Sequence, residues 1–146
     1  MVIALTSAAI VAAANAAPAT QPSGLGITAR QILRDSGLVP KVDGAKGIYA
    51  QNATQTVNVV VEGEAEHPSR LDILFKSENG ADGPMNDALL LVRKVMPDWK
   101  GAADFCKANM PLVLNGTVDQ LTAKVGNRIV LLSFKKHVQM YLITVS

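Results

Sequence analysis

The segment that decides the fold is residues 82–109, with the sequence DGPMNDALLLVRKVMPDWKGAADFCKAN. Pro84 predicts the start of a helix, because proline lacks an N–H group and holds φ at a value that suits the first helical position. Pro97 predicts its end, because a proline disfavours helical geometry at the residue before it. The segment is therefore expected to form two helices joined at a proline.

Both expected helices are amphipathic, and each has an apolar side at the 3.6-residue period of a helix. The apolar side of the first helix is formed by Met85, Ala88, Leu89, Val92, Val95 and Met96. The second helix is expected at Trp99–Asn109, with Asp98 as its N-cap, and Trp99, Phe105 and Cys106 on its apolar side. Amphipathic helices bury their apolar sides, so other segments of the chain must supply the core against which these two pack.

Leu90 does not fit this pattern, because it lies on the polar side of the first helix beside Arg93 and Lys94. A single exposed leucine is common in monomeric proteins and needs no cause. The alternative is that Leu90 contacts another chain.

The composition indicates one packed domain. The chain has 146 residues, of which 49% are hydrophobic and 18% are charged, and this is typical of a globular protein rather than a disordered one. The net charge is +2, with acidic and basic residues interspersed, so no basic stripe suggests a nucleic-acid partner.

Residues 1–16 are expected to be a signal peptide. An apolar run at Val2–Ala14 is followed by Ala14-Asn15-Ala16, a small-x-small cleavage pattern. The run is too short to span a bilayer comfortably, so no integral membrane span is expected in the mature chain. This pattern predicts a periplasmic or secreted protein, with a linker at residues 17–27 and a single α+β domain at residues 28–146.

Alternation of apolar and polar residues predicts a hairpin of two strands, at residues 55–66 and 70–76. A turn about Pro68 would place Val61 opposite Phe75 and Glu66 opposite Arg70. A weaker strand is expected at residues 47–51, after a polar turn at residues 41–46.

Two capping boxes predict two more short helices. Thr28 and Gln31 mark one at residues 28–36, and Thr117 and Gln120 mark one at residues 118–125. The rival for the second is a strand that ends in a hairpin turn at Gly126-Asn127. The chain closes with strands at residues 128–135 and 138–145, which are apolar on both faces. They are expected to be central strands, or strands whose second face another subunit covers.

The predicted fold class is α+β: an antiparallel sheet of about five strands with helices packed mainly on one face, in the order α-β-β-β-α-α-(α)-β-β. From Thr28 to Lys76 the chain resembles the type III secretion chaperone-like fold and the bacterial sensory-transduction-regulator proteins built on it. The resemblance is carried by the capped helix, the turn Val42-Asp43-Gly44 and the hairpin from Val57 to Phe75. It implies a protein that dimerises and binds protein segments.

Few residues are candidates for catalysis or metal binding. Cys106 is the only cysteine, and its place on an apolar helix side predicts a buried structural thiol. His67 and His137 lie in expected turns and lack the spacing of metal ligands. Glu62, Glu64 and Glu66 share one strand face and are expected to be solvated rather than to hold a cation. We expect no catalytic residue, cofactor or metal.

The sequence therefore predicts an exported, non-enzymatic domain that binds another protein or associates with itself as a homodimer. The expected interface residues are Leu90, Val130, Leu132, Tyr141 and Ile143. The alternative is a protein that binds a small apolar ligand between the sheet and the second helix, in a pocket lined by Trp99, Phe105, Met85 and Met96. An enzyme of unidentified class is the third hypothesis.

Overall fold

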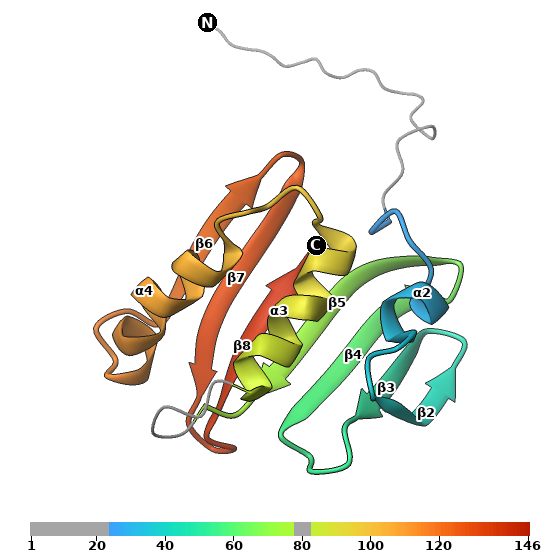
Figure 1. Ribbon diagram of the computed structural model, residues 1–146, viewed down its shortest axis with the longest axis horizontal. Helices are drawn as coiled ribbons and strands as arrows, with labels where there is room; N and C mark the ends of the chain where they lie inside the picture. The colour runs from blue at the N-terminus through green and yellow to red at the C-terminus, as the bar shows by residue number, and fades with distance from the viewer. Residues whose placement is uncertain (1–23, 78–82) are drawn as a thin grey trace, which may run out of the picture.

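The computed structural model describes residues 24–77 and 83–146 of the protein. In these ranges the elements follow in the order α2 (Ala29–Leu33), β2 (Val39–Gly44), β3 (Gly47–Gln51), β4 (Val57–Glu64), β5 (His67–Phe75), α3 (Gly83–Val95), α4 (Ala102–Leu114), β6 (Gln120–Val125), β7 (Arg128–Lys135) and β8 (Met140–Val145). All seven strands join one antiparallel sheet with the strand order β2-β3-β4-β5-β8-β7-β6 (Figure 1). The α+β class and the antiparallel sheet are confirmed, and the sheet is larger than expected.

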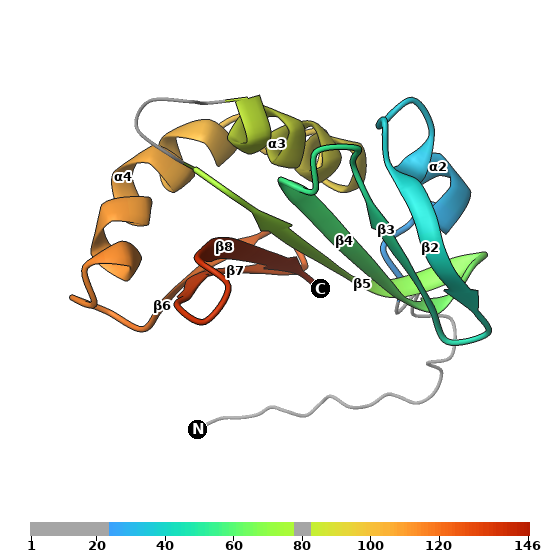
Figure 2. The ribbon, with the colours of Figure 1, turned by 90° about the horizontal axis from the view of Figure 1, so that it is seen from below.

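The three helices cover the same face of the sheet, so the domain has two layers (Figure 2). Their apolar sides meet the inward side chains of β4, β5, β7 and β8 in one core, where Leu89 and Val92 of α3 and Ile73 of β5 are buried. The expectation that the last two strands are central is confirmed in part. β8 lies between β5 and β7 near the middle of the sheet, whereas β7 is next to the edge strand β6.

Two strands at the edges of the sheet differ from the sequence expectation. Residues 41–46 do not form only a turn, because β2 runs through them to Gly44 before the chain turns at Ala45 and Lys46. Residues 118–125 are not a helix, because β6 occupies Gln120–Val125 and ends at the Gly126-Asn127 hairpin. The Thr117 hydroxyl donates to the side-chain oxygen of Asn115, 2.5 Å away, so it stabilises a local turn instead of capping a helix.

The central helical pair forms with different bounds. α3 covers the first expected helix and ends at Val95, before Pro97. The second helix begins at Ala102, with Gly101 as N-cap and no side-chain cap, so the expected cap at Asp98 is wrong. The helix also continues through Pro111 to Leu114, although a proline inside a helix removes one internal hydrogen bond and crowds the preceding turn. Figure 2 shows α4 curving over the end of the sheet towards β6.

The β4–β5 hairpin has the expected faces and a different register. Val61 lies opposite Leu71 rather than Phe75, and Arg70 lies opposite Glu62 rather than Glu66. The pairing of Val61 is displaced by four residues, an even number, so every side chain keeps its face. A β-bulge between Glu62 and Gly63 shifts the pairing register near the turn of the hairpin. The φ of +103° at Gly63 favours glycine, and an added Cβ would lie 2.9 Å from the amide nitrogen of Ser69.

The capping box at Thr28 is confirmed, although α2 is shorter than expected. The Gln31 amide donates to the Thr28 hydroxyl (3.1 Å), and the Thr28 amide donates to the Gln31 side-chain oxygen (2.8 Å). Residues 24–27 of the expected linker belong to the packed domain, since Leu25 is buried in the core and its amide donates to the carbonyl of Pro68 (2.7 Å). The expected signal peptide at residues 1–16 lies outside the described residues.

Candidate interaction surface

The face of the sheet opposite the helices carries a cluster of apolar side chains. No helix of residues 24–77 or 83–146 lies on this face (Figure 2). Strand alternation places on it apolar side chains of four adjacent strands, among them Val60 of β4, Leu74 of β5, Leu142 of β8 and Leu131 of β7. These four side chains keep partial exposure to solvent. We call this set the helix-free cluster.

The helix-free cluster surrounds a buried polar pair. The Thr144 hydroxyl of β8 donates to Oδ1 of Asp72 on β5, 2.6 Å away, and Arg70 Nε donates to the same oxygen at 3.0 Å. The Asp72 side chain is only 13% exposed, although no helix of the described residues lies over this face. The neighbouring carboxylate raises the pKa of Arg70, through the hydrogen bond first and the charge attraction second. The centre of the face is thus fixed by charge-assisted hydrogen bonds.

A second polar group borders the helix-free cluster on the β3 side. Gln51 Nε2 donates to Oδ1 of Asn58 (3.0 Å), and the Tyr49 hydroxyl donates to the same oxygen (3.3 Å). The Asn58 amide in turn points to the sulfur of Met140, 3.7 Å away. The side chains at this border therefore hold one another in place, with an apolar centre beside them.

Four of the five expected interface residues lie in the core. Val130, Leu132, Tyr141 and Ile143 point to the helical side of the sheet and are buried. Tyr141 packs between Phe75 and Phe134, with ring centroids 5.5 Å and 5.0 Å away, and this burial raises its pKa. The expectation that these four residues form a free surface is therefore corrected. The alternate residues of the same strands, Leu131 and Leu142, face outward instead.

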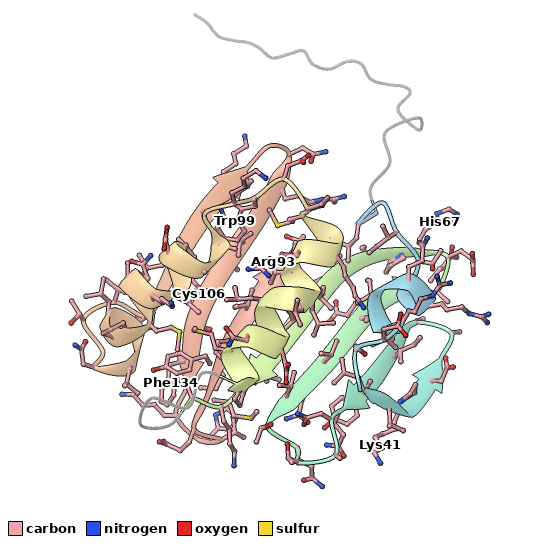
Figure 3. All side chains as sticks on the ribbon, viewed as in Figure 1. Lys41, His67, Arg93, Trp99, Cys106 and Phe134 are labelled. Atoms are coloured by element: carbon pink, nitrogen blue, oxygen red, sulfur yellow. The ribbon has the colours of Figure 1, made fainter. Side chains whose placement is uncertain are left out.

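Leu90 is exposed, as its place in the helix predicts, with 53% of its surface accessible. It borders an open hollow of about 420 Å³ between α3 and the turn that follows α2. Charged groups of both signs surround this hollow, with Asp35 and Asp87 on one hand and Arg93 and Lys94 on the other. Arg93 points outward from α3 in Figure 3. The hollow therefore has no dominant charge that would indicate a ligand class.

The four residues of the expected ligand pocket do not come together. Trp99 and Met96 line an open hollow of about 340 Å³ beside the β6–β7 turn. Met85 lines another of about 260 Å³ with Met110 and Tyr141. Met85 lies in the first turn of α3 and Met96 directly follows its last residue, so the two are eleven residues apart, about 16 Å at 1.5 Å per residue. Phe105 packs against Trp99, with ring centroids 5.5 Å apart.

The remaining candidate residues are separated from one another. Cys106 is buried on α4, and this burial raises the pKa of its thiol to about 11 (Figure 3). His67 is exposed at the β4–β5 turn, at the other side of the molecule (Figure 3). In the described part of the chain no three His, Cys, Asp or Glu side chains are placed to hold a metal ion. The burial of Cys106 is confirmed.

Comparisons with protein-family models, curated proteins and solved structures found no match to the chain. Of the helices that the structure describes, none has both the length and the apolar character needed to cross a membrane.

Proposed function

We propose that the protein is an exported, non-enzymatic domain that binds another protein or a second copy of itself, and that the helix-free cluster is the centre of its binding surface. The observation that carries this proposal is the one-sided covering of the sheet, which leaves Val60, Leu74, Leu131 and Leu142 partly exposed together. Export rests on the signal-peptide pattern of residues 1–16.

The arrangement of the face supports a protein partner. Protein interfaces combine an apolar centre with a polar border, and their polar groups are positioned before binding. Here the apolar side chains of the helix-free cluster surround a preformed Asp72–Thr144 pair and are bordered by the Gln51–Asn58 amide contacts. Leu74 and Leu142 are direct neighbours across β5 and β8, so the partly exposed apolar surface is continuous there. The resemblance to the chaperone-like fold implies binding of the same kind.

A site-specific cross-linking experiment tests the proposal. A photo-reactive amino acid replaces Leu74, and the matched control carries it at Val138, an exposed apolar residue of the β7–β8 turn. We expect illumination in the producing cell to give a discrete adduct from position 74 and none from position 138. Mass spectrometry of the adduct distinguishes a second copy from another protein. Equal yields at both positions, or no adduct at position 74, would refute the proposed surface.

A Leu74→Lys variant gives an independent check in the same cells. Position 74 is only partly buried, so we expect the Leu74→Lys protein to fold with the circular dichroism of the wild type. We also expect it to lose the adduct when the photo-reactive residue is placed at Leu142, because a charge at the apolar centre opposes binding. An unchanged adduct would show that the partner does not contact the centre of the helix-free cluster.

A further inference from the structure

The sheet has two edge strands, β2 and β6, and in the described residues neither pairs on its outer side. An edge strand offers unpaired N–H and C=O groups to any other strand that approaches. Natural proteins protect such edges with prolines, lysines, bulges or a covering segment. The two edges of this protein differ sharply in these features.

The β2 edge is protected. It contains Pro40, which has no N–H group to offer, and a bulge that leaves Lys41 without a partner in the β3 register. Lys41 extends from this edge in Figure 3. All six residues of β2 are exposed. Proline, a bulge and a lysine on one short strand are the usual means of preventing edge pairing.

The β6 edge has little protection. Its six residues pair with β7 without a break, it contains no proline or bulge, and Lys124 is its only charged residue. Its inward residues Leu121, Ala123 and Val125 pack against the core and remain partly exposed. Trp99 and Phe105 are partly exposed in the helical layer, which α4 extends over this end of the sheet. At β6 both layers therefore end in incompletely covered apolar side chains.

The backbone groups that β6 offers follow from its register. The amide of Ile129 on β7 donates to the Ser146 carbonyl (2.8 Å), and the Ser146 amide donates to the Ile129 carbonyl (3.0 Å). Ile129 thus uses its backbone on the β8 side, and its β6 partner Lys124 directs its own N–H and C=O away from β7. By the alternation of an antiparallel pair, Thr122 and Gln120 do the same.

We propose that β6 pairs antiparallel with β6 of a second copy, about a twofold axis that passes Thr122. Each copy then offers the outward backbone groups of Gln120, Thr122 and Lys124. In this register Thr122 faces Thr122 of the second copy, and Gln120 faces Lys124. In this register the outward N–H and C=O groups of all three residues form hydrogen bonds between the two strands. A shift of the register by one hydrogen-bonded pair, in either direction, would leave some of these groups unpaired.

The side chains of β6 are compatible with this self-pairing. Threonine opposite threonine is a favourable cross-strand pair, and no lysine meets a lysine. Asp119, which precedes Gln120, lies at the same end of the strand pair as Lys124 of the second copy, so opposite charges approach at both ends. On the inward face Leu121 meets Ala123 of the second copy, which covers part of the apolar side chains left exposed at this edge.

The pairing would join the two seven-stranded sheets into one and leave both helix-free clusters on the same side. A twofold axis perpendicular to the sheet preserves its faces. The assembly would thus present two copies of the proposed binding surface to one partner, which increases apparent affinity without new contacts. The edge and the face are separate surfaces, so either proposal can fail while the other holds.

Substitutions that introduce a positive or a negative charge at Thr122 test the pairing. We expect the wild type to be a dimer by light scattering at micromolar concentration, and Thr122→Lys and Thr122→Glu each to be a folded monomer, because like charges then meet at the axis. Mixing these two variants should restore a dimer. The control pair Val42→Lys and Val42→Glu, on the β2 edge, should remain dimeric. A monomeric wild type, or dimers that persist in both Thr122 variants, would overturn the proposal.

Hydrogen exchange of the wild type tests the same pairing if the variants do not fold. We expect the amides of Thr122 and Lys124 to exchange slowly at high protein concentration and at least tenfold faster on dilution below the dissociation constant. The outward-facing amides of β2 should exchange fast at both concentrations. Fast, concentration-independent exchange at Thr122 and Lys124 would overturn the proposal.

Discussion

The ammonium group of Lys94 on α3 donates a 3.0 Å hydrogen bond to the carbonyl oxygen of Ile32 in α2, and it also reaches the carbonyl of Arg34. These carbonyls are at the end of α2, where a helix has unpaired acceptors and the negative end of its dipole. α2 has only five residues, and a helix this short is not stable alone. Lys94 therefore fastens α2 to the helical layer.

We predict that Lys94→Met lowers the free energy of unfolding by about 1–2 kcal/mol, because it removes charge-assisted bonds to the end of α2 and retains most of the apolar stem. Urea denaturation followed by circular dichroism measures the change. Arg93→Met is the control, since Arg93 is exposed on the same helix, and it should change stability by less than about 0.5 kcal/mol. Equal effects of the two substitutions would contradict the role of Lys94.

The parts of the fold that the sequence predicts best are those with strong local signals. Alternation identifies β4 and β5, prolines mark both ends of α3, and Thr28 marks the start of α2. β2 escapes prediction because all six of its residues are exposed, so no alternation of burial shapes its sequence. β6 does alternate, with Leu121, Ala123 and Val125 inward, but the capping-box pattern at Thr117 competes with that signal.

The interaction surface is harder to predict than the fold. Alternation along β4 and β5 puts Val60 and Leu74 on the face opposite to Val61 and Phe75, which is the helix-free face of the sheet in the structure. For β7 and β8 both faces are apolar, so the sequence does not reveal which one the helices cover. Only the packing of α4 on β7 shows that Leu132 is inward and Leu131 is outward. Tertiary contacts, which local patterns do not encode, determine that choice.

We predict that Asp72 and Thr144 stabilise the sheet jointly. Thr144→Val removes the donor 2.6 Å from the Asp72 carboxylate and should cost about 1–3 kcal/mol, because it leaves a buried carboxylate with fewer donors. A double-mutant cycle with Asp72→Asn, measured by urea denaturation, should give a coupling energy of about 1 kcal/mol or more. Additive effects would show that the two side chains do not depend on one another.

Gly63→Ala should lower the free energy of unfolding by more than Gly37→Ala. Both glycines have a positive φ, +103° at Gly63 and +75° at Gly37. An added Cβ at Gly63 would lie 2.9 Å from the Ser69 nitrogen, whereas at Gly37 no atom lies within 4 Å. We expect about 1 kcal/mol for Gly37→Ala and roughly 1–2 kcal/mol more for Gly63→Ala. Thermal and urea denaturation measure both, and equal losses would show that the bulge relaxes freely.

The buried thiol of Cys106 predicts a pH dependence of stability. Burial raises its pKa from 9.0 to about 11 in the folded protein, and unfolding restores the lower value. Between these pKa values the unfolded chain has lost the thiol proton and the folded protein has kept it. The stabilisation that comes from keeping the thiol neutral is thus complete below pH 9 and is lost as the pH rises through 11. Over this range the free energy of unfolding falls by about 1.4 kcal/mol per pH unit at most.

Comparison with Cys106→Ala isolates this effect, because alanine does not titrate and every other group is unchanged. We expect the wild type to lose roughly 1–3 kcal/mol more than Cys106→Ala between pH 8 and pH 11, measured by urea denaturation under reducing conditions. Native labelling with a bulky thiol reagent at pH 8 should also be slow, because the thiolate is scarce and the sulfur is covered. Parallel pH profiles of the two proteins together with rapid labelling would place Cys106 in contact with solvent.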